Sequence, residues 1–202
     1  YGMTIAEYAK MVNGEKWLAN GIQCDLKTVE CENYSHMDWY QLPIPPSPNL
    51  PNMASVYLYP SLCLFEGTEM SVGRGTDMAF QVVGHPLLKN AGYQFTPAVM
   101  PGAKNPPYLG QVCHGHDLHA FALLYVRDYK SLYLYWLLSC YKDMPNQGEF
   151  FNDFFEKLAG TKTLREQIIA GNTEEQIRAS WMPGIVKFKA IRKKYLMYED
   201  FE

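Results

Sequence analysis

The densest run of polar side chains in the sequence lies between Glu66 and Thr76. Three glycines in this run permit positive φ angles and a close approach of the backbone to a ligand. Arg74, between Gly73 and Gly75, offers a planar fork of donors that suits a carboxylate or a phosphate. The run also supplies three hydroxyl groups, on Thr68, Ser71 and Thr76. Together these residues predict a recognition loop for an anionic ligand.

The sequence of this loop allows two other interpretations. A nucleotide-binding P-loop requires the pattern GxxxxGK[ST], and the segment has no lysine at the required place. The second alternative is structural: a glycine-rich turn in which Arg74 binds loop carbonyl groups. The sequence leaves recognition and this structural role open.

Carboxylates are the second group that could do chemistry. A glycosidase needs two of them, one on each side of the bond to be cleaved. Four acids lie in plausible surroundings, but no two have a telling spacing: Asp25, Glu66, Asp77 and Asp117. Glu66, beside the glycine-rich loop, is the best single candidate for catalysis. The alternative is that its carboxylate binds backbone amides.

A histidine cluster follows at His114, His116 and His119, with Asp117 beside it. On a strand, His114 and His116 would point to one face, as the ligands of a metal can. The segment lacks further ligands at a convincing spacing, and the five cysteines form no CxxC pair. We therefore expect partly exposed histidines and no metal or other cofactor; a metal-dependent hydrolase is a third-ranked alternative.

Aromatic residues make up 14% of the sequence. Most of them must be core residues. Five lie where they could instead stack on sugar rings: Trp39, Tyr57, Tyr59, Tyr93 and Tyr108.

The overall composition excludes several classes of protein. With 48% hydrophobic and 19% charged residues the chain is globular. Its formal charge of −3 and scattered basic residues give no footprint for nucleic acid. The most apolar segment, Leu132 to Tyr141, is half the length needed to span a bilayer. Whether Cys24 and Cys31 form a disulfide stays open.

The elements that must position these residues indicate an α+β fold, with a small sheet in the first half and a helix-rich second half. Capping boxes predict helix starts at Thr4, Thr163 and Thr173. A loop rich in proline covers residues 42–52. Strands are predicted at 22–29, 95–100 and 109–113, and helices at 54–65, 121–144, 151–158 and in the last 40 residues.

Several segments together resemble one bacterial family, the exo-β-N-acetylmuramidases of the NamZ type. They occur in order along the whole chain: residues 2–5, 46–51, 59–68, 71–76 and 158–161, then Trp181 and residues 192–196. The segment 46–51 adds Asn49 to the candidate substrate-binding residues Glu66, Thr68, Ser71, Arg74 and Thr76. The sequence departs from the family pattern at Ala79, where proline is usual, and at His114 and His116.

The resemblance implies that residues 1–202 are a single C-terminal domain of a two-domain enzyme whose N-terminal half is Rossmann-like. It implies removal of terminal N-acetylmuramic acid from peptidoglycan fragments in a cleft between the halves, outside the cytoplasm. The proposed catalytic glutamate of the family has no counterpart here, so we expect this chain alone to be inactive. The alternative is a non-catalytic carbohydrate-binding or assembly module.

Overall fold

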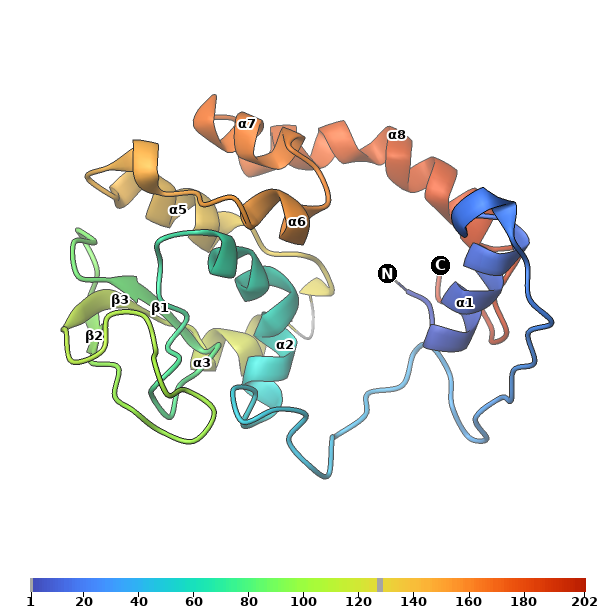
Figure 1. Ribbon diagram of the computed structural model, residues 1–202, viewed down its shortest axis with the longest axis horizontal. Coiled ribbons are helices and arrows are strands. Elements are labelled where there is room, and N and C mark those ends of the chain that lie inside the picture. Colours follow the sequence, from blue (N-terminus) through green and yellow to red (C-terminus); the bar gives the residue numbers. More distant parts are fainter. Residues whose placement is uncertain (1, 127–128) are drawn as a thin grey trace. The chain divides into compact units, whose positions relative to one another are not determined.

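The computed structural model describes residues 2–126 and 129–202, and the chain divides into two units. The first unit comprises Tyr1–Tyr40 and Arg178–Glu202, and the second comprises Gln41–Ile177. The fold is α+β, as the sequence predicts, with one small sheet (Figure 1). No helix among the described residues is both long and apolar enough to cross a membrane.

The sheet of the second unit has three antiparallel strands in the order β1-β3-β2. They are β1 (Val82–His85), β2 (Tyr93–Phe95) and β3 (Cys113–Asp117). In the β1–β3 register Gly84 faces Gly115, and a Cβ atom on Gly115 would lie 2.0 Å from the carbonyl oxygen of Val83. The two strands can therefore pair only because both positions are glycine.

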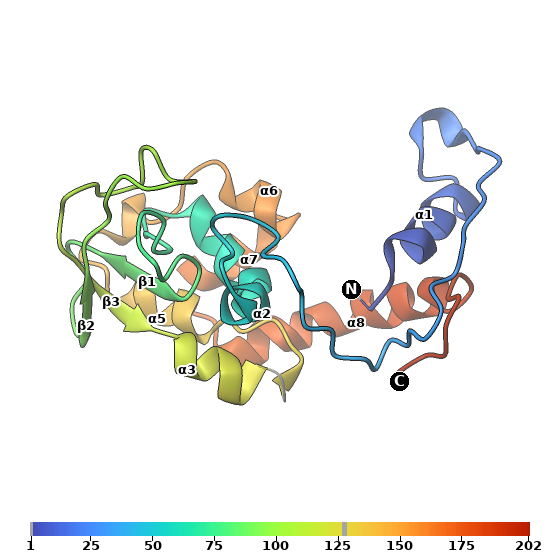
Figure 2. The ribbon, with the colours of Figure 1, turned by 90° about the horizontal axis from the view of Figure 1, so that it is seen from below.

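The helices of the second unit lie to one side of this sheet, and loops run along its other side (Figures 1 and 2). They are α2 (Met53–Leu62), the 3₁₀ turn Cys63–Gly67, α3 (His119–Phe121), the π-helical turn Ala122–Val126, α5 (Tyr135–Asp143), the 3₁₀ turn Gln147–Glu149, α6 (Phe155–Ala159) and α7 (Thr163–Ile169). The turn Cys63–Gly67 contacts α6. A Cβ atom on Gly67 would lie 2.4 Å from Cα of Phe155, so glycine is what permits this contact.

The first unit contains α1 (Ile5–Gly14), the 3₁₀ turn Ala19–Gly21 and most of α8 (Glu174–Arg192).

The capping boxes predicted at Thr4 and Thr173 are confirmed by reciprocal hydrogen bonds with Glu7 and Gln176. The capping box predicted at Thr163 is wrong. Thr163 lies inside α7, and its amide donates to the hydroxyl of Thr161.

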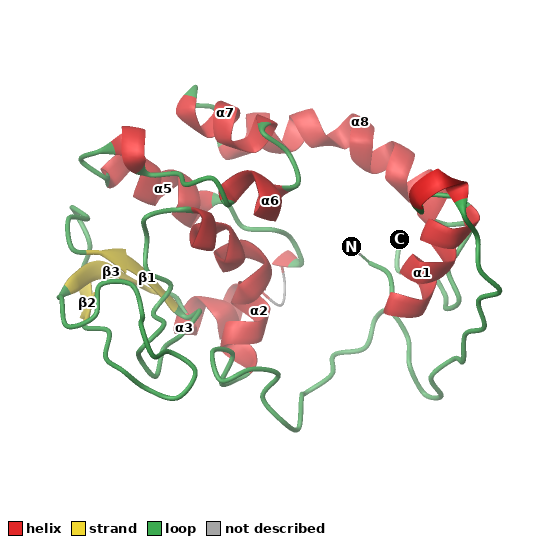
Figure 3. Cartoon of the chain, in the orientation of Figure 1, coloured by secondary structure: helices red, strands yellow, loops and turns green. Residues whose placement is uncertain are grey.

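The predicted strand at residues 22–29 is wrong, since Figure 3 shows this stretch as loop. In this stretch the backbone of Cys24 forms hydrogen bonds with a side chain, whereas the backbone of a strand would bond to a neighbouring strand. Asn13 accepts from the amide of Cys24 at 2.8 Å and donates to its carbonyl group at 3.0 Å. One asparagine side chain thus takes the place of the strand partner that the alternation of apolar and polar residues predicted.

The predicted strands at 95–100 and 109–113 each overlap an observed strand by one residue, β2 at Phe95 and β3 at Cys113. Strand β1 was not predicted, because its four residues are all buried and show no alternation. The long helix predicted at 121–144 is wrong as one element. Residues 127–128 of it lie outside the described part, and residues 130–134 are not helical.

The interruption before α5 has a specific cause. The amide of Tyr133 donates to the hydroxyl of Ser61 at 2.8 Å, and the amide of Leu134 donates to Glu174 at 3.4 Å. Because side chains from other elements satisfy these amides, the apolar run does not need to continue as a helix.

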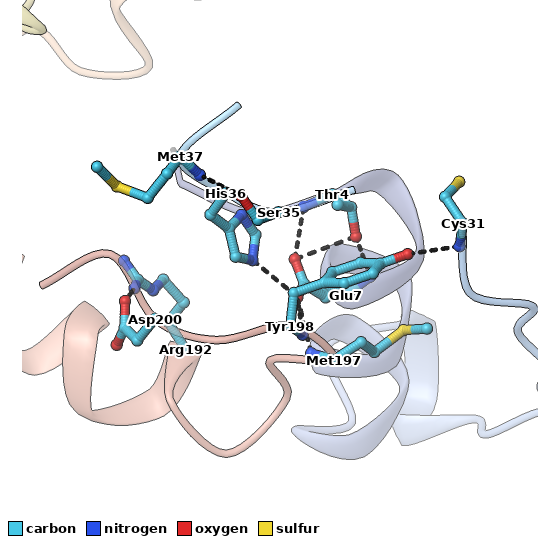
Figure 4. Close-up of polar contacts among 10 residues, drawn as sticks. All are labelled: Thr4, Glu7, Cys31, Ser35, His36, Met37, Arg192, Met197, Tyr198 and Asp200. Carbon is cyan, nitrogen blue, oxygen red and sulfur yellow. Dashed lines mark hydrogen bonds and ion pairs between the residues drawn. The ribbon is translucent and has the colours of Figure 1, made fainter. Parts of the chain in front are cut away.

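Glu7 is the organising residue of the first unit (Figure 4). Its side chain is fully buried and accepts hydrogen bonds from the amide and hydroxyl of Thr4, from Nε2 of His36 at 3.0 Å, and from the amide of Met197 at 2.7 Å. Burial raises the pKa of Glu7, but these hydrogen bonds outweigh it and lower the pKa to about 2. One carboxylate therefore joins α1 to the segment around His36 and to the C-terminal segment.

Glu7→Gln should destabilise the protein by about 2 kcal/mol or more at pH 7, because an amide replaces one acceptor oxygen with a donor that faces other donors. A carboxylate whose pKa is lowered on folding stabilises the protein above its ordinary pKa of 4.5, and this stabilisation is lost as the pH falls towards 2. Urea unfolding should therefore show the difference from wild type shrinking across that range. Glu15→Gln, at a partly exposed acid of the same unit, should cost less; equal losses would contradict the assignment.

Candidate functional site

The loop from Glu66 to Thr76 is held at two points by pairs of backbone hydrogen bonds. At its start, Glu69 donates to Phe150 at 2.9 Å and Asn152 donates to Gly67 at 3.0 Å. In its middle, Ser71 and Gly84 exchange two bonds of 2.8 and 2.9 Å. The second pair fastens the loop to β1, so the loop is a built feature of the fold.

Glycine is required at two positions of the loop. Gly73 has φ +76° and Gly75 has φ +84°, a region that other residues rarely adopt. A Cβ atom on Gly73 would lie 2.5 Å from Cγ2 of Val82, and one on Gly75 would lie 2.7 Å from the carbonyl oxygen of Ala98. The chain thus turns on both sides of Arg74 in a way that only glycine allows.

Arg74 forms an ion pair with Glu66, with 2.6 Å between Nη2 and Oε1. The two side chains are 32% and 24% exposed, so both are accessible to a ligand. The guanidinium carbon lies 5.0 Å from the centre of the Phe80 ring, within range of a cation–π contact. The charged head of Arg74 is therefore fixed from two directions.

A pocket of about 140 Å³ opens beside this ion pair. Six residues line it: Glu66, Thr68, Met70, Val72, Arg74 and Pro107. Of the six residues predicted to bind substrate, the structure thus brings Glu66, Thr68 and Arg74 together around one pocket. Ser71, Thr76 and Asn49 are not among the lining residues.

The three hydroxyl groups of the loop hold the loop itself. Thr68 donates to the carbonyl of Phe65 at 2.7 Å, and Thr76 donates to the carbonyl of Gly73 at 2.7 Å. The fully buried hydroxyl of Ser71 accepts from the amide of Gly73. These are local turns of the kind that serine and threonine favour.

Asn49 is engaged elsewhere, since its side-chain amide donates to the carbonyl of Gly102 at 3.1 Å. Its role in substrate binding stays a prediction, as do those of Thr68, Ser71 and Thr76.

The histidine cluster is spread over separate contacts. His114 contacts Gln94 at 3.3 Å, the ring of His116 lies against that of Trp136, and His119 bonds to Gln81 at 2.6 Å. Burial lowers the pKa of His116, which favours its neutral form. Among residues 2–126 and 129–202, no three His, Cys, Asp or Glu side chains converge on a point that could hold a metal.

Two residues outside the loop, Phe80 and Tyr108, support the site, and the sequence did not predict these roles. Phe80 is buried with φ +54°, which is unusual for a bulky residue and marks a backbone held by its surroundings. Tyr108 donates from its hydroxyl to the carbonyl of Glu69 at 2.6 Å, and burial raises its pKa to about 12. The hydroxyl of Tyr108 thus secures the loop, and sugar stacking by its ring stays a prediction. No local pattern marks the backbone angle of Phe80.

The family model described as exo-beta-N-acetylmuramidase NamZ, C-terminal, matches residues 57–198. This chain belongs to that family. The corresponding N-terminal model matches residues 1–54, so the two matches meet at the start of α2. The assignment of residues 1–202 to a single C-terminal domain stays a prediction.

Individual relatives agree with this membership. Peptidoglycan beta-N-acetylmuramidase NamZ of Bacillus subtilis (strain 168) is 32% identical over 98% of this chain, which spans 50% of that protein. A crystal structure of a DUF1343 family protein from Bacteroides fragilis NCTC 9343 is 47% identical, with a TM-score of 0.90 over 98% of this chain and 56% of the other. A second one, 22% identical with a TM-score of 0.76, shares the fold. The chain spans about half the length of these relatives.

Gly73→Ala should disrupt the loop, because it adds a steric clash to an unfavourable φ angle. Gly160 is a matched control: it has φ +70° at the end of α6, but no atom lies within 4 Å of an added Cβ. Gly160→Ala should cost about 1–2 kcal/mol, the penalty of the left-handed conformation alone. Gly73→Ala should cost clearly more in urea unfolding. Equal costs would mean that the packing of Gly73 against Val82 contributes nothing.

Proposed function

We propose that this chain is the substrate-cleft part of an exo-acting β-N-acetylmuramidase that releases terminal N-acetylmuramic acid from peptidoglycan fragments. Membership of the NamZ family and the peptidoglycan beta-N-acetylmuramidase of Bacillus subtilis to which the chain is similar support the reaction class. Peptidoglycan lies outside the cytoplasmic membrane, so the proposal includes an extracytoplasmic location. It also includes an N-terminal half of the same protein as partner.

The observation that carries the proposal is the position of Arg74 at the pocket. N-acetylmuramic acid differs from N-acetylglucosamine by a lactyl ether that ends in a carboxylate. A guanidinium binds a carboxylate through two parallel hydrogen bonds, which an ammonium group cannot reproduce. Arg74 is the cation among the lining residues, and its accessible head can distinguish the two sugars.

Glu66 leaves room for this interaction. It accepts a hydrogen bond from Nη2 of Arg74, whereas an arginine has five N–H donors in all. An edge of the guanidinium thus remains for a ligand. In this arrangement Glu66 orients Arg74 through the ion pair. The cation–π contact with the Phe80 ring holds the guanidinium from a second direction.

The pocket lining contains one carboxylate, on Glu66, and this carboxylate is paired with Arg74. Glycoside hydrolysis ordinarily uses two carboxylates at a defined separation. We therefore assign substrate recognition to this part of the enzyme, with the acid that protonates the leaving group on the N-terminal half. Glu66 contributes by positioning Arg74.

Arg74→Lys in the full-length gene product should weaken binding of N-acetylmuramic acid by tenfold or more, while binding of N-acetylglucosamine changes little. A charge-assisted pair contributes about 1.5–3 kcal/mol, which corresponds to this factor. Calorimetric titration with both sugars measures the effect. Turnover of a chromogenic N-acetylmuramic acid glycoside tests whether the recognition serves catalysis.

Arg165 provides a matched control for this substitution. It pairs with Glu156 at 2.9 Å with 30% and 25% exposure, and its guanidinium lies 5.5 Å from the Phe151 ring centre, but it does not line the pocket. Arg165→Lys should leave both affinities unchanged. Equal losses for the two sugars in Arg74→Lys, together with a lower melting temperature, would show that Arg74 only ties down the loop.

A further inference from the structure

The pocket beside Arg74 is too small for a whole amino sugar. Its volume of about 140 Å³ is well below the roughly 300 Å³ at which pockets for small organic ligands usually begin. It can accept the lactyl group that carries the carboxylate. The pyranose ring must then lie outside the pocket, on the surface next to Arg74.

Tyr59 is an accessible aromatic side chain close to the ion pair, since the charges of Glu66 and Arg74 both act on its pKa. Its ring packs against Phe80, with 5.1 Å between the ring centres and a tilt of 59°. Phe80 is also the ring below the Arg74 guanidinium, so Tyr59 and Arg74 share one support. Tyr59 nevertheless remains 39% exposed.

The hydroxyl of Tyr59 is not used to hold the fold. It makes no hydrogen bond to any residue in the described part of the chain, in contrast to Tyr108, whose hydroxyl binds a loop carbonyl. Burial raises the pKa of Tyr59, and the nearby Glu66 carboxylate raises it further while Arg74 opposes this effect. The side chain is therefore a neutral phenol close to both charges of the ion pair.

We propose that Tyr59 forms the wall on which the pyranose ring of the ligand stacks while its carboxylate enters the pocket and binds Arg74. The inference rests on the proposed function and extends it by separating two tasks. Tyr59 would bind the ring that N-acetylmuramic acid and N-acetylglucosamine have in common. Arg74 would bind the group in which they differ.

If the two tasks are separate, substitutions at Tyr59 should weaken both sugars, whereas those at Arg74 should weaken N-acetylmuramic acid alone. Tyr59→Ala should weaken both sugars by a similar factor of about ten, the value expected for exposing about 50 Å² of apolar contact. Tyr59→Phe should bind both sugars nearly as wild type does, because it keeps the ring. The full-length gene product is titrated with N-acetylmuramic acid and N-acetylglucosamine. Tyr59→Leu, apolar but not aromatic, replaces Tyr59→Ala if the latter does not fold.

Tyr135 supplies the control, as a tyrosine that is 52% exposed and packs on Trp136 but does not contact Phe80 or Arg74 in any described interaction. Tyr135→Ala should leave both affinities unchanged. The inference is overturned if Tyr59→Ala and Tyr59→Leu bind both sugars as wild type does, or if Tyr59→Phe loses as much as they do. In either case a selective loss in Arg74→Lys would leave the proposed function standing, whereas non-selective loss there would remove it independently of Tyr59.

Discussion

Two backbone hydrogen bonds between Ser71 and Gly84 connect the glycine-rich loop to the sheet, and the candidate site depends on them. They fix the point from which the chain turns through Gly73, and hence the direction in which Arg74 projects. Gly84 can make this pairing while also facing Gly115 across the β1–β3 ladder only because it has no side chain. A Cβ atom at this position would lie 2.6 Å from the carbonyl oxygen of His114. Main-chain hydrogen bonds thus attach the irregular loop to the small sheet.

Glu7 and Glu66 both accept hydrogen bonds that hold other parts of the chain in position. In the first unit Glu7 accepts hydrogen bonds from backbone amides and from the imidazole of His36. In the second unit Glu66 accepts one from the guanidinium of Arg74. Their chemical settings differ because Glu7 is withdrawn from solvent whereas Glu66 borders a pocket. In both cases the carboxylate is already engaged by donors of the chain itself, which agrees with the proposal that the proton donor lies on the N-terminal half.

Local signals in the sequence predicted the features that local chemistry determines. The capping boxes at Thr4 and Thr173 formed as expected, and the glycines around Arg74 adopt the positive φ angles that their type suggests. Features that depend on distant partners were missed. Asn13 replaces a strand partner for Cys24, Ser61 interrupts a helical run at Tyr133, and the fully buried β1 shows no periodicity.

The candidate site shows the same division. The composition of residues 66–76 identified the loop and Arg74. The contacts of Arg74 with Glu66 and Phe80 could not be predicted, because the angle of φ +54° at Phe80 has no sequence signature. The loop hydroxyls illustrate the converse: their types suggested ligand contacts, yet Thr68 and Thr76 bind carbonyls of their own turns.

We propose that Arg74 binds the negatively charged lactyl group, and a change in the ligand tests this role most directly. Affinities of the full-length gene product for N-acetylmuramic acid and for its uncharged lactyl amide can be measured in wild type and in Arg74→Ala. We predict that wild type prefers the acid by about tenfold or more and that Arg74→Ala has lost this preference. An equal preference for the acid in both proteins would show that another group binds the carboxylate and would contradict this account.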